Sequence, residues 1–192
     1  MRAYNPLSVD ELGRNAARAL MDYPLCELPP PQSFQGCGVY TIHYQGKFPL
    51  YSGMRDVEPI YVGKADPPGK RQGRASASAK GVTTLYNRIR KHAASIQSTE
   101  NLELPDFFCR WLILDPVWIG LTEQVLISEY QPIWNIVVDG FGVNAPGRGR
   151  ANQRRSQWDT LHPGRPWAAS LPPNDKTAES ILIGVAAHKG MP

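Results

Sequence analysis

Apolar residues recur along the chain at helical spacing in some stretches and at strand spacing in others. A first helix is predicted over residues 9–21, because Ser8 and Glu11 stand three positions apart and form a capping box at its start. The run Leu28-Pro29-Pro30-Pro31 follows, and consecutive prolines make a stiff connector. The N-terminal part is therefore predicted to be a packing helix joined to the rest by a short rigid segment.

Two short strands, each carrying one tyrosine, are predicted next. They are Val39–Tyr44 and Pro59–Lys64, where β-branched and aromatic residues are bounded by glycines. Successive strand side chains point to opposite faces, so Tyr40 and Tyr61 can both be aimed at one side of a sheet. Such tyrosines are more often half-buried sheet residues than catalytic groups, and their role depends on the rest of the chain.

Further apolar segments complete the predicted fold. Apolar residues at helical spacing predict helices over residues 85–97 and 117–130, and the run Phe107–Leu114 predicts a strand in the middle of a small sheet. A last apolar stretch, Ile181–Val185, either adds an edge strand or packs on the core. This order predicts an α+β fold, in which a small, mostly antiparallel β-sheet is flanked by helices.

The length favours a single structural domain, because 192 residues are enough for one hydrophobic core. Three parts are expected within it. They are an N-terminal helix with its proline-rich connector at 1–35, a core at 36–140 and a C-terminal arm at 141–192.

Positive charge is concentrated in two segments. The net charge is +4 and the pI is about 9.0, and the lysines and arginines cluster in Lys64–Lys80 and again in Arg148–Arg165. Basic segments of this kind are compatible with solvated surface loops and also with binding of phosphate groups. Trp158 and Trp167 lie in and just after the second segment, near a histidine, an arginine and prolines, which indicates an arm that docks, with side chains available for stacking or base contacts.

Cysteine usage and hydropathy exclude several other classes of protein. The three cysteines are widely spaced and include no C-x-x-C pair, so neither a disulfide framework nor a zinc site is supported. The N-terminus lacks an apolar signal core, and no apolar run approaches the length of a membrane span. We therefore expect a cytoplasmic protein with no membrane association.

Four residues on the later helices are candidates for chemistry. Arg88 and His92 stand four positions apart, so they lie on one face of their helix beside its apolar stripe. Glu123 lies near the apolar face of the next helix, where an acid is costly to bury unless it is paired or bound to a metal. Asn135 follows twelve residues later, just after a proline.

Taken in order, these motifs resemble those of the GIY-YIG endonuclease superfamily. The set is Gly38-Val39-Tyr40, Tyr61-Val62-Gly63, Arg88 with His92, Glu123 and Asn135, and the resemblance covers about residues 38–135. Val39 and Val62 stand where the family has isoleucine, and the gap between the tyrosines is longer than in compact members. These insertions, the histidine after the arginine and the tail Trp158–Trp167 look most like the type II restriction endonuclease branch. Within it, the pattern is similar to enzymes that cut CCGCGG.

The resemblance implies a metal site and a phosphate site. Glu123 is expected to hold Mg²⁺ (or Mn²⁺), which is often bound by one or two carboxylates together with waters and phosphate oxygens. Arg88 is expected to clamp the scissile phosphate, because a guanidinium matches phosphate oxygens bidentately. Asn135 is expected to support the Glu123 end of the site by hydrogen bonding, although the residues alone are equally compatible with a helix cap.

The resemblance also implies a base that activates water. Tyr40 is the candidate, with His92 taking its proton, because a free tyrosine with a pKa near 10 is a poor base at neutral pH. Tyr61 is expected to orient the water or the phosphate. The roles of the two tyrosines can be exchanged without violating any feature of the sequence.

The implied substrate is double-stranded DNA, and the two basic segments are expected to bind it. A GC-rich palindrome as the target implies a homodimer with one active site per strand, and a cognate DNA methyltransferase is implied as well. The N-terminal helix, the 45–58 insertion and the tail are all candidate interfaces. The residues expected to contact DNA are Lys64, Lys70, Arg71, Arg74, Lys80, Arg148, Arg150, Arg154, Arg155, Trp158, His162 and Arg165.

Three other interpretations compete with a restriction enzyme. A repair or mobile-element nuclease of the same superfamily would nick one strand or cut a branched structure, and such proteins usually carry a separate DNA-binding domain. A non-catalytic DNA-binding protein would use the same basic surfaces, but it would tolerate loss of Glu123 or Tyr40. A basic globular protein with coincidental motifs is the third.

Overall fold

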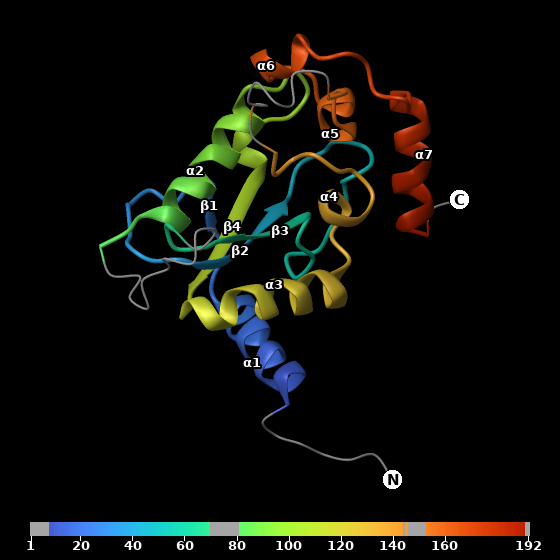
Figure 1. Ribbon diagram of the computed structural model, residues 1–192. Helices are drawn as coiled ribbons and strands as arrows, with labels where there is room; N and C mark the ends of the chain where they lie inside the picture. Colours follow the sequence, from blue (N-terminus) through green and yellow to red (C-terminus); the bar gives the residue numbers. More distant parts are fainter. Residues whose placement is uncertain (1–7, 70–80, 144, 146–152, 191–192) are drawn as a thin grey trace.

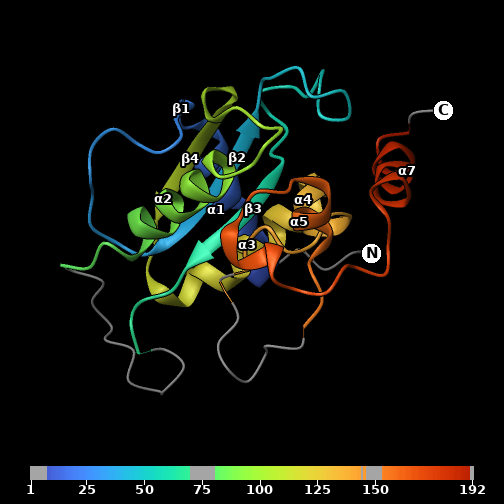
Figure 2. The same cartoon turned by 90° about the horizontal axis from the view of Figure 1, so that it is seen from above.

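An antiparallel sheet organises the chain, with helices against both of its faces (Figures 1 and 2). The computed structural model describes residues 8–69, 81–143, 145 and 153–190. Within these residues the sheet has four strands in the order β1-β4-β2-β3. The strands are β1 (Cys26–Glu27), β2 (Gly38–Tyr44), β3 (Tyr61–Ala65) and β4 (Phe107–Ile113). The predicted α+β class is confirmed, and β4 lies inside the sheet as expected.

The three predicted helices begin and end close to the predicted residues, whereas strand β1 and three short helices in the second half of the chain were not predicted. Ser8 caps the first helix as predicted, its hydroxyl accepting from the amide of Glu11, whereas the Glu11 carboxylate pairs with Arg14. The edge strand considered for Ile181–Val185 is wrong, because this stretch lies in a helix and packs on the core through Ile181 and Val185. The helices are α1 (Val9–Asp22), α2 (Thr84–Gln97), α3 (Pro116–Tyr130), α4 (Ile133–Ile136), α5 (Gln157–Leu161), α6 (Pro166–Ala169) and α7 (Ala178–His188), with a short 3-10 turn at Leu104–Asp106.

Strand β2 is buried along its whole length, because both faces of the sheet are covered. Val39 belongs to an apolar cluster with residues of α1 and α3, such as Ala17 and Leu126. Its neighbour Tyr40 belongs to a second cluster on the opposite face, together with Leu85 and other residues of α2. The alternation of strand side chains therefore places Tyr40 on the face covered by α2.

The C-terminal arm packs into the same core as the tyrosine face of the sheet. Trp158 of α5 is fully buried and contacts Trp134 and Phe141, with ring centroids 5.6 and 5.1 Å apart. The 45–58 insertion joins this region, since the hydroxyl of Tyr51 lies 2.8 Å from Nε2 of His162. The arm thus docks on the core of the protein itself, and Trp158 is not available for stacking on bases. Among the described residues, no helix combines the length and apolarity needed to cross a membrane.

Candidate active site

Two tyrosines from adjacent strands lie on the face of the sheet that α2 covers. Tyr40 pairs with Gly63 across the ladder, and Tyr61 pairs with Ile42, so the two tyrosines are diagonal neighbours on one face. Their ring centroids are 6.2 Å apart. The two motifs therefore meet in space because β2 and β3 pair in this register.

His92 completes this group from the middle of α2. Its Nε2 lies 2.6 Å from the hydroxyl of Tyr40, and its ring centroid lies 5.2 Å from that of Tyr61. Burial, followed by the neighbouring Tyr61, raises the pKa of Tyr40 well above its ordinary value, although Arg88 opposes the shift. Burial, followed by the charges of Arg88 and Arg165, lowers the pKa of His92 well below its ordinary value. Near neutral pH the phenol and the imidazole are therefore both uncharged, and the hydroxyl of Tyr40 and Nε2 of His92 share one hydrogen bond.

Gly63 leaves the space that the Tyr40 phenol fills. A Cβ atom at this position would collide with the hydroxyl of Tyr40 and would lie 2.9 Å from Cε1 of Tyr61. The close approach of the tyrosine ring to the backbone thus requires a residue without a side chain here.

We expect Gly63→Ala to lower the free energy of unfolding by about 1–3 kcal/mol, because the added methyl group overpacks a buried site. Urea or thermal unfolding measures the change. Gly120→Ala is the matched control, since a Cβ there meets nothing within 4 Å and alanine favours the helix. Equal stability of the two variants would contradict the close approach at Gly63.

Arg88 lies one helical turn before His92 and reaches a backbone segment that covers the site. Its Nη2 donates to the carbonyl of Gly142 at 2.7 Å. A Cβ atom at Gly142 would lie 2.5 Å from the hydroxyl of Tyr61, so this segment passes directly beside the phenol. The ring of Phe141 stacks on His92, with centroids 4.5 Å apart and planes at 25°.

Phe141 and Gly142 were not among the residues that the sequence singled out. The predicted division of the chain places them at the beginning of the C-terminal arm. An aromatic residue between two glycines was the available signal, and its meaning depends on contacts with α2, which lies far away along the chain.

Glu123 approaches the site from α3 around the free edge of β3. Its side chain is 18% exposed, and Oε2 lies 2.5 Å from Nζ of Lys64. The hydrogen bond that Lys64 donates to Glu123 raises the pKa of Lys64, while burial opposes this. The Glu123 carboxylate also contributes to raising the pKa of Tyr61, which burial raises most and Arg88 opposes. The carboxylate is therefore near enough to the tyrosine face to influence its charge.

Asn135 holds the exposed edge of β3 in place. Its Oδ1 accepts from the amide of Val62 at 2.8 Å, and its Nδ2 donates to the carbonyl of Val62 at 2.9 Å. These are the backbone groups that an edge strand leaves unpaired. In the structure Asn135 thus supports β3 between Tyr61 and Gly63, whereas its expected hydrogen bond to the Glu123 end is replaced by this contact with the strand.

The donor set suits a hard cation bound by one carboxylate. Among residues 8–69, 81–143, 145 and 153–190, no group of three or more His, Cys, Asp or Glu side chains could hold a metal ion. Glu123 is partly exposed, and its present partner is the ammonium group of Lys64, so the carboxylate already sits beside a positive charge. A magnesium-like ion that keeps waters and phosphate oxygens as its other ligands fits such a site.

The basic residues expected to contact DNA have different surroundings. Arg154 is exposed and pairs with Asp175 at 2.5 Å. Arg155 donates to the carbonyls of Ala168 and Ala169, so its guanidinium binds the protein itself. Six residues of this group lie outside the described residues: Lys70, Arg71, Arg74, Lys80, Arg148 and Arg150.

Burial contradicts the expectation that Trp158, His162 and Arg165 contact DNA. Their exposed fractions are 0%, 0% and 3%. His162 lies between Tyr51 and Asn101, and Arg165 is paired with Asp159. An arm that stacks on DNA bases and a segment buried in an aromatic cluster can have the same alternation of aromatic and basic residues. In this protein long-range packing buries the segment.

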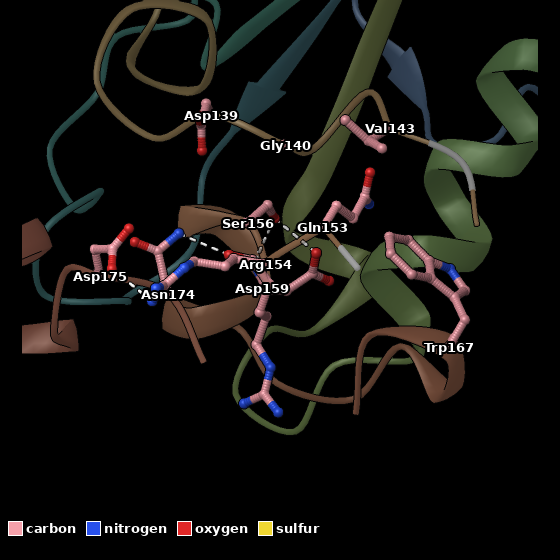
Figure 3. A pocket seen from close by; sticks show the side chains of 11 residues that line it. Asp139, Gly140, Val143, Gln153, Arg154, Ser156, Asp159, Trp167, Asn174 and Asp175 are labelled. Atoms are coloured by element: carbon pink, nitrogen blue, oxygen red, sulfur yellow. Dashed lines mark hydrogen bonds and ion pairs between the residues drawn. The ribbon is translucent and has the colours of Figure 1, made fainter. Parts of the chain in front are cut away.

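A separate pocket of about 340 Å³ opens beside the arm (Figure 3). Gly140 and Val143 line it together with Asp159 and Trp167. None of the six residues predicted to act in catalysis is part of its lining. The pocket therefore lies on another side of the 140–143 segment than the tyrosine face, because that segment contributes to both.

A family model described as the Eco29kI GIY-YIG domain matches residues 32–189 of the chain. The match includes both tyrosine strands, α2, α3 and the C-terminal arm. No curated protein sequence matches the chain.

Proposed function

The chain belongs to the Eco29kI family of GIY-YIG restriction endonucleases, and we propose that it cuts double-stranded DNA with the help of a divalent metal ion at a GC-rich palindrome. The observation that carries the proposal is one group of neighbouring side chains. Tyr40 is hydrogen-bonded to His92, and Tyr61 and Arg88 lie beside this pair. Glu123 pairs with Lys64 of β3. A palindrome similar to CCGCGG is the proposed target.

Tyr40 and His92 are proposed to relay a proton away from the attacking water. The phenolic oxygen takes a proton from the water while its own proton passes to Nε2 of His92, 2.6 Å away. Burial keeps His92 neutral and so available to accept a proton, although the same lowered pKa makes it a weak base. The raised pKa of Tyr40 is unfavourable for a free phenolate, so transfer of the two protons together is the more accessible route.

Arg88 is proposed to bind the scissile phosphate in place of the Gly142 carbonyl. In the structure its Nη2 donates to that carbonyl at 2.7 Å, which is the type of acceptor that a phosphate oxygen replaces. Both Arg88 and Glu123 influence the pKa of Tyr61, and Tyr61 is proposed to orient the water or the phosphate. Substrate binding then requires the Gly142 carbonyl to give up this contact.

Glu123 is the residue that would hold Mg²⁺ or Mn²⁺, since GIY-YIG nucleases generally use divalent metals. When bound, such an ion relieves negative charge on the phosphate and the leaving oxygen. Lys64 neutralises the carboxylate in the structure, and we propose that it contacts DNA once that carboxylate has another partner.

A palindromic target supports further proposals about partners. A two-fold protein matches a two-fold DNA site, so we propose a homodimer with one active site per strand. A cognate methyltransferase would protect the host DNA, and a cytoplasmic location stays a prediction.

Plasmid cleavage tests the proposed function. The protein is incubated with plasmid DNA with Mg²⁺, and separately with EDTA, and the ends of any fragments are sequenced. Discrete, metal-dependent fragments with one shared end sequence are expected. Binding without cleavage would contradict the catalytic assignment, and single-strand nicks would contradict cleavage of a palindrome by two active sites.

We expect Arg154→Ala to weaken DNA binding and to reduce the slope of log affinity against log salt by about 1, because one phosphate contact is lost. Arg154 is exposed and its partner Asp175 lies on the surface, so it is available to DNA. Arg155→Ala is the control, because Arg155 donates to backbone carbonyls of the protein. Filter binding at several salt concentrations measures both, and an unchanged slope for Arg154→Ala would remove this residue from the interface.

A further inference from the structure

Arg165 has an unusually complete set of partners inside the protein. Its guanidinium forms a bidentate ion pair with Asp159, at 2.5 Å from Nε to Oδ1 and 2.6 Å from Nη2 to Oδ2. It also lies 4.6 Å from the ring centroids of both Trp158 and Trp167. Only 3% of the residue is exposed. The arginine is therefore held rigidly by one carboxylate and two aromatic rings.

The remaining donors of Arg165 bind one backbone segment, residues 140–143. Nη2 donates to the carbonyl of Gly140 at 3.0 Å, and Nη1 donates to those of Phe141 and Val143 at 3.3 and 3.2 Å. Figure 3 shows Gly140 and Val143 lining the same pocket as Asp159 and Trp167. A single side chain thus fixes the carbonyls on both sides of Gly142.

The same segment contacts the candidate catalytic residues directly. The carbonyl of Gly142 accepts from Arg88, the ring of Phe141 stacks on His92, and that ring also meets Tyr61 edge-on with centroids 4.9 Å apart. A shift of the segment would therefore move the partners of Arg88, His92 and Tyr61 together. Small displacements of such groups are costly, since about 1 Å can reduce a rate about 100-fold.

We propose that Arg165 is a positioning residue for cleavage, which acts through the 140–143 backbone to set the placement of His92 and Tyr61. It touches neither the reacting atoms nor DNA. Its role rests on the proposed nuclease function, and it replaces the DNA contact that the sequence suggested for it. Lysine cannot substitute, because one ammonium group cannot bind a carboxylate bidentately and also span three carbonyls.

Arg165→Lys is the direct test, with Arg110→Lys as the matched control. Arg110 is also buried, at 8% exposed, and it donates to the carbonyls of Tyr23 and Asp56. It pairs with Thr41 in the ladder and so lies on the face of the sheet opposite to Tyr40. Both substitutions remove a buried guanidinium, but only the first loosens the segment beside the catalytic residues.

Cleavage of the plasmid is measured with Mg²⁺ at a temperature where both variants are folded, and DNA affinity is measured with Ca²⁺. Arg165→Lys is expected to lower kcat about 10–100-fold while KM and DNA affinity stay within about twofold. Arg110→Lys is expected to retain kcat. Retained kcat in Arg165→Lys, or equal losses in the two variants, would overturn the proposal.

Amide hydrogen exchange tests the positioning role of Arg165 independently of the proposed nuclease function. In Arg165→Lys the amides of residues 138–143 are expected to exchange faster, while those of β2 and α2 stay unchanged. This readout holds even if the wild-type protein cuts no DNA, and unchanged exchange would overturn the positioning role. If Arg165→Lys does not fold, Trp167→Leu is used, because Trp167 is only partly buried, and it is expected to change kcat and exchange in the same directions by smaller amounts.

Discussion

Glu123→Gln is expected to abolish DNA cleavage and to leave DNA binding intact. The substitution keeps the size of the side chain but removes the charge that would hold a divalent metal ion. Loss of a metal that stabilises the transition state costs about 4 kcal/mol, which is about a thousandfold in rate. Single-turnover cleavage measures the rate, and gel shift with Ca²⁺ measures binding. Calorimetric titration with Mn²⁺ should show the loss of one binding site.

Glu129→Gln is the control for this prediction. Glu129 lies on the same helix, is exposed and pairs only at 3.9 Å with Arg14, so its replacement is expected to leave cleavage unchanged. Full activity of Glu123→Gln would contradict the assignment of Glu123 as the metal ligand. Stronger DNA binding in Glu123→Gln would instead point to the released Lys64, because the two side chains form an ion pair 2.5 Å apart.

Tyr40→Phe is expected to reduce the cleavage rate by about 10²–10⁴, because it removes the group that accepts a proton from water. It also leaves Nε2 of His92 buried without the hydroxyl that now lies 2.6 Å away. An unsatisfied buried group of this kind costs about 1–3 kcal/mol of stability. Single-turnover rates and thermal unfolding therefore have to be measured on the same samples.

The fold supplies a closely matched control, Tyr51→Phe. Tyr51 is also fully buried, and its hydroxyl also lies beside Nε2 of a buried histidine, His162, at 2.8 Å. Tyr51→Phe is expected to lose similar stability and to keep the cleavage rate. Equal loss of rate in the two variants would reduce the role of Tyr40 to packing. A larger loss in Tyr61→Phe than in Tyr40→Phe would exchange the roles of the two tyrosines.

Local features of the sequence predicted α2 and the strands β2, β3 and β4 well, whereas the two-residue strand β1 was missed. The stripe of Leu85, Ile89, Ala93 and Ile96 repeats at helical spacing, and all four residues are buried in α2. The same periodicity placed Arg88 and His92 one turn apart on that helix. The run at Ile181–Val185 was ambiguous, because a short apolar run fits a helix and a strand equally well, and α7 forms where the run meets the core.

Long-range contacts could not be predicted in this way. The histidine and arginine near the two tail tryptophans were expected at the DNA surface, yet His162 and Arg165 are buried with partners from other parts of the fold. Likewise, Asn135 binds the backbone of Val62 instead of the Glu123 end. Each of these pairings joins segments whose proximity is set by the packing of helices against the sheet.

The sequence by itself determined the fold class, the order of the catalytic motifs and the family, because periodicity and motif order are properties of the chain read locally. Only the tertiary structure decided how the motifs meet. The register of β2 and β3 brings Tyr40 and Tyr61 to one face, α3 brings Glu123 to Lys64, and the buried arm holds Gly142 against Arg88. These contacts depend on burial and on hydrogen bonds between distant segments, which no local pattern encodes.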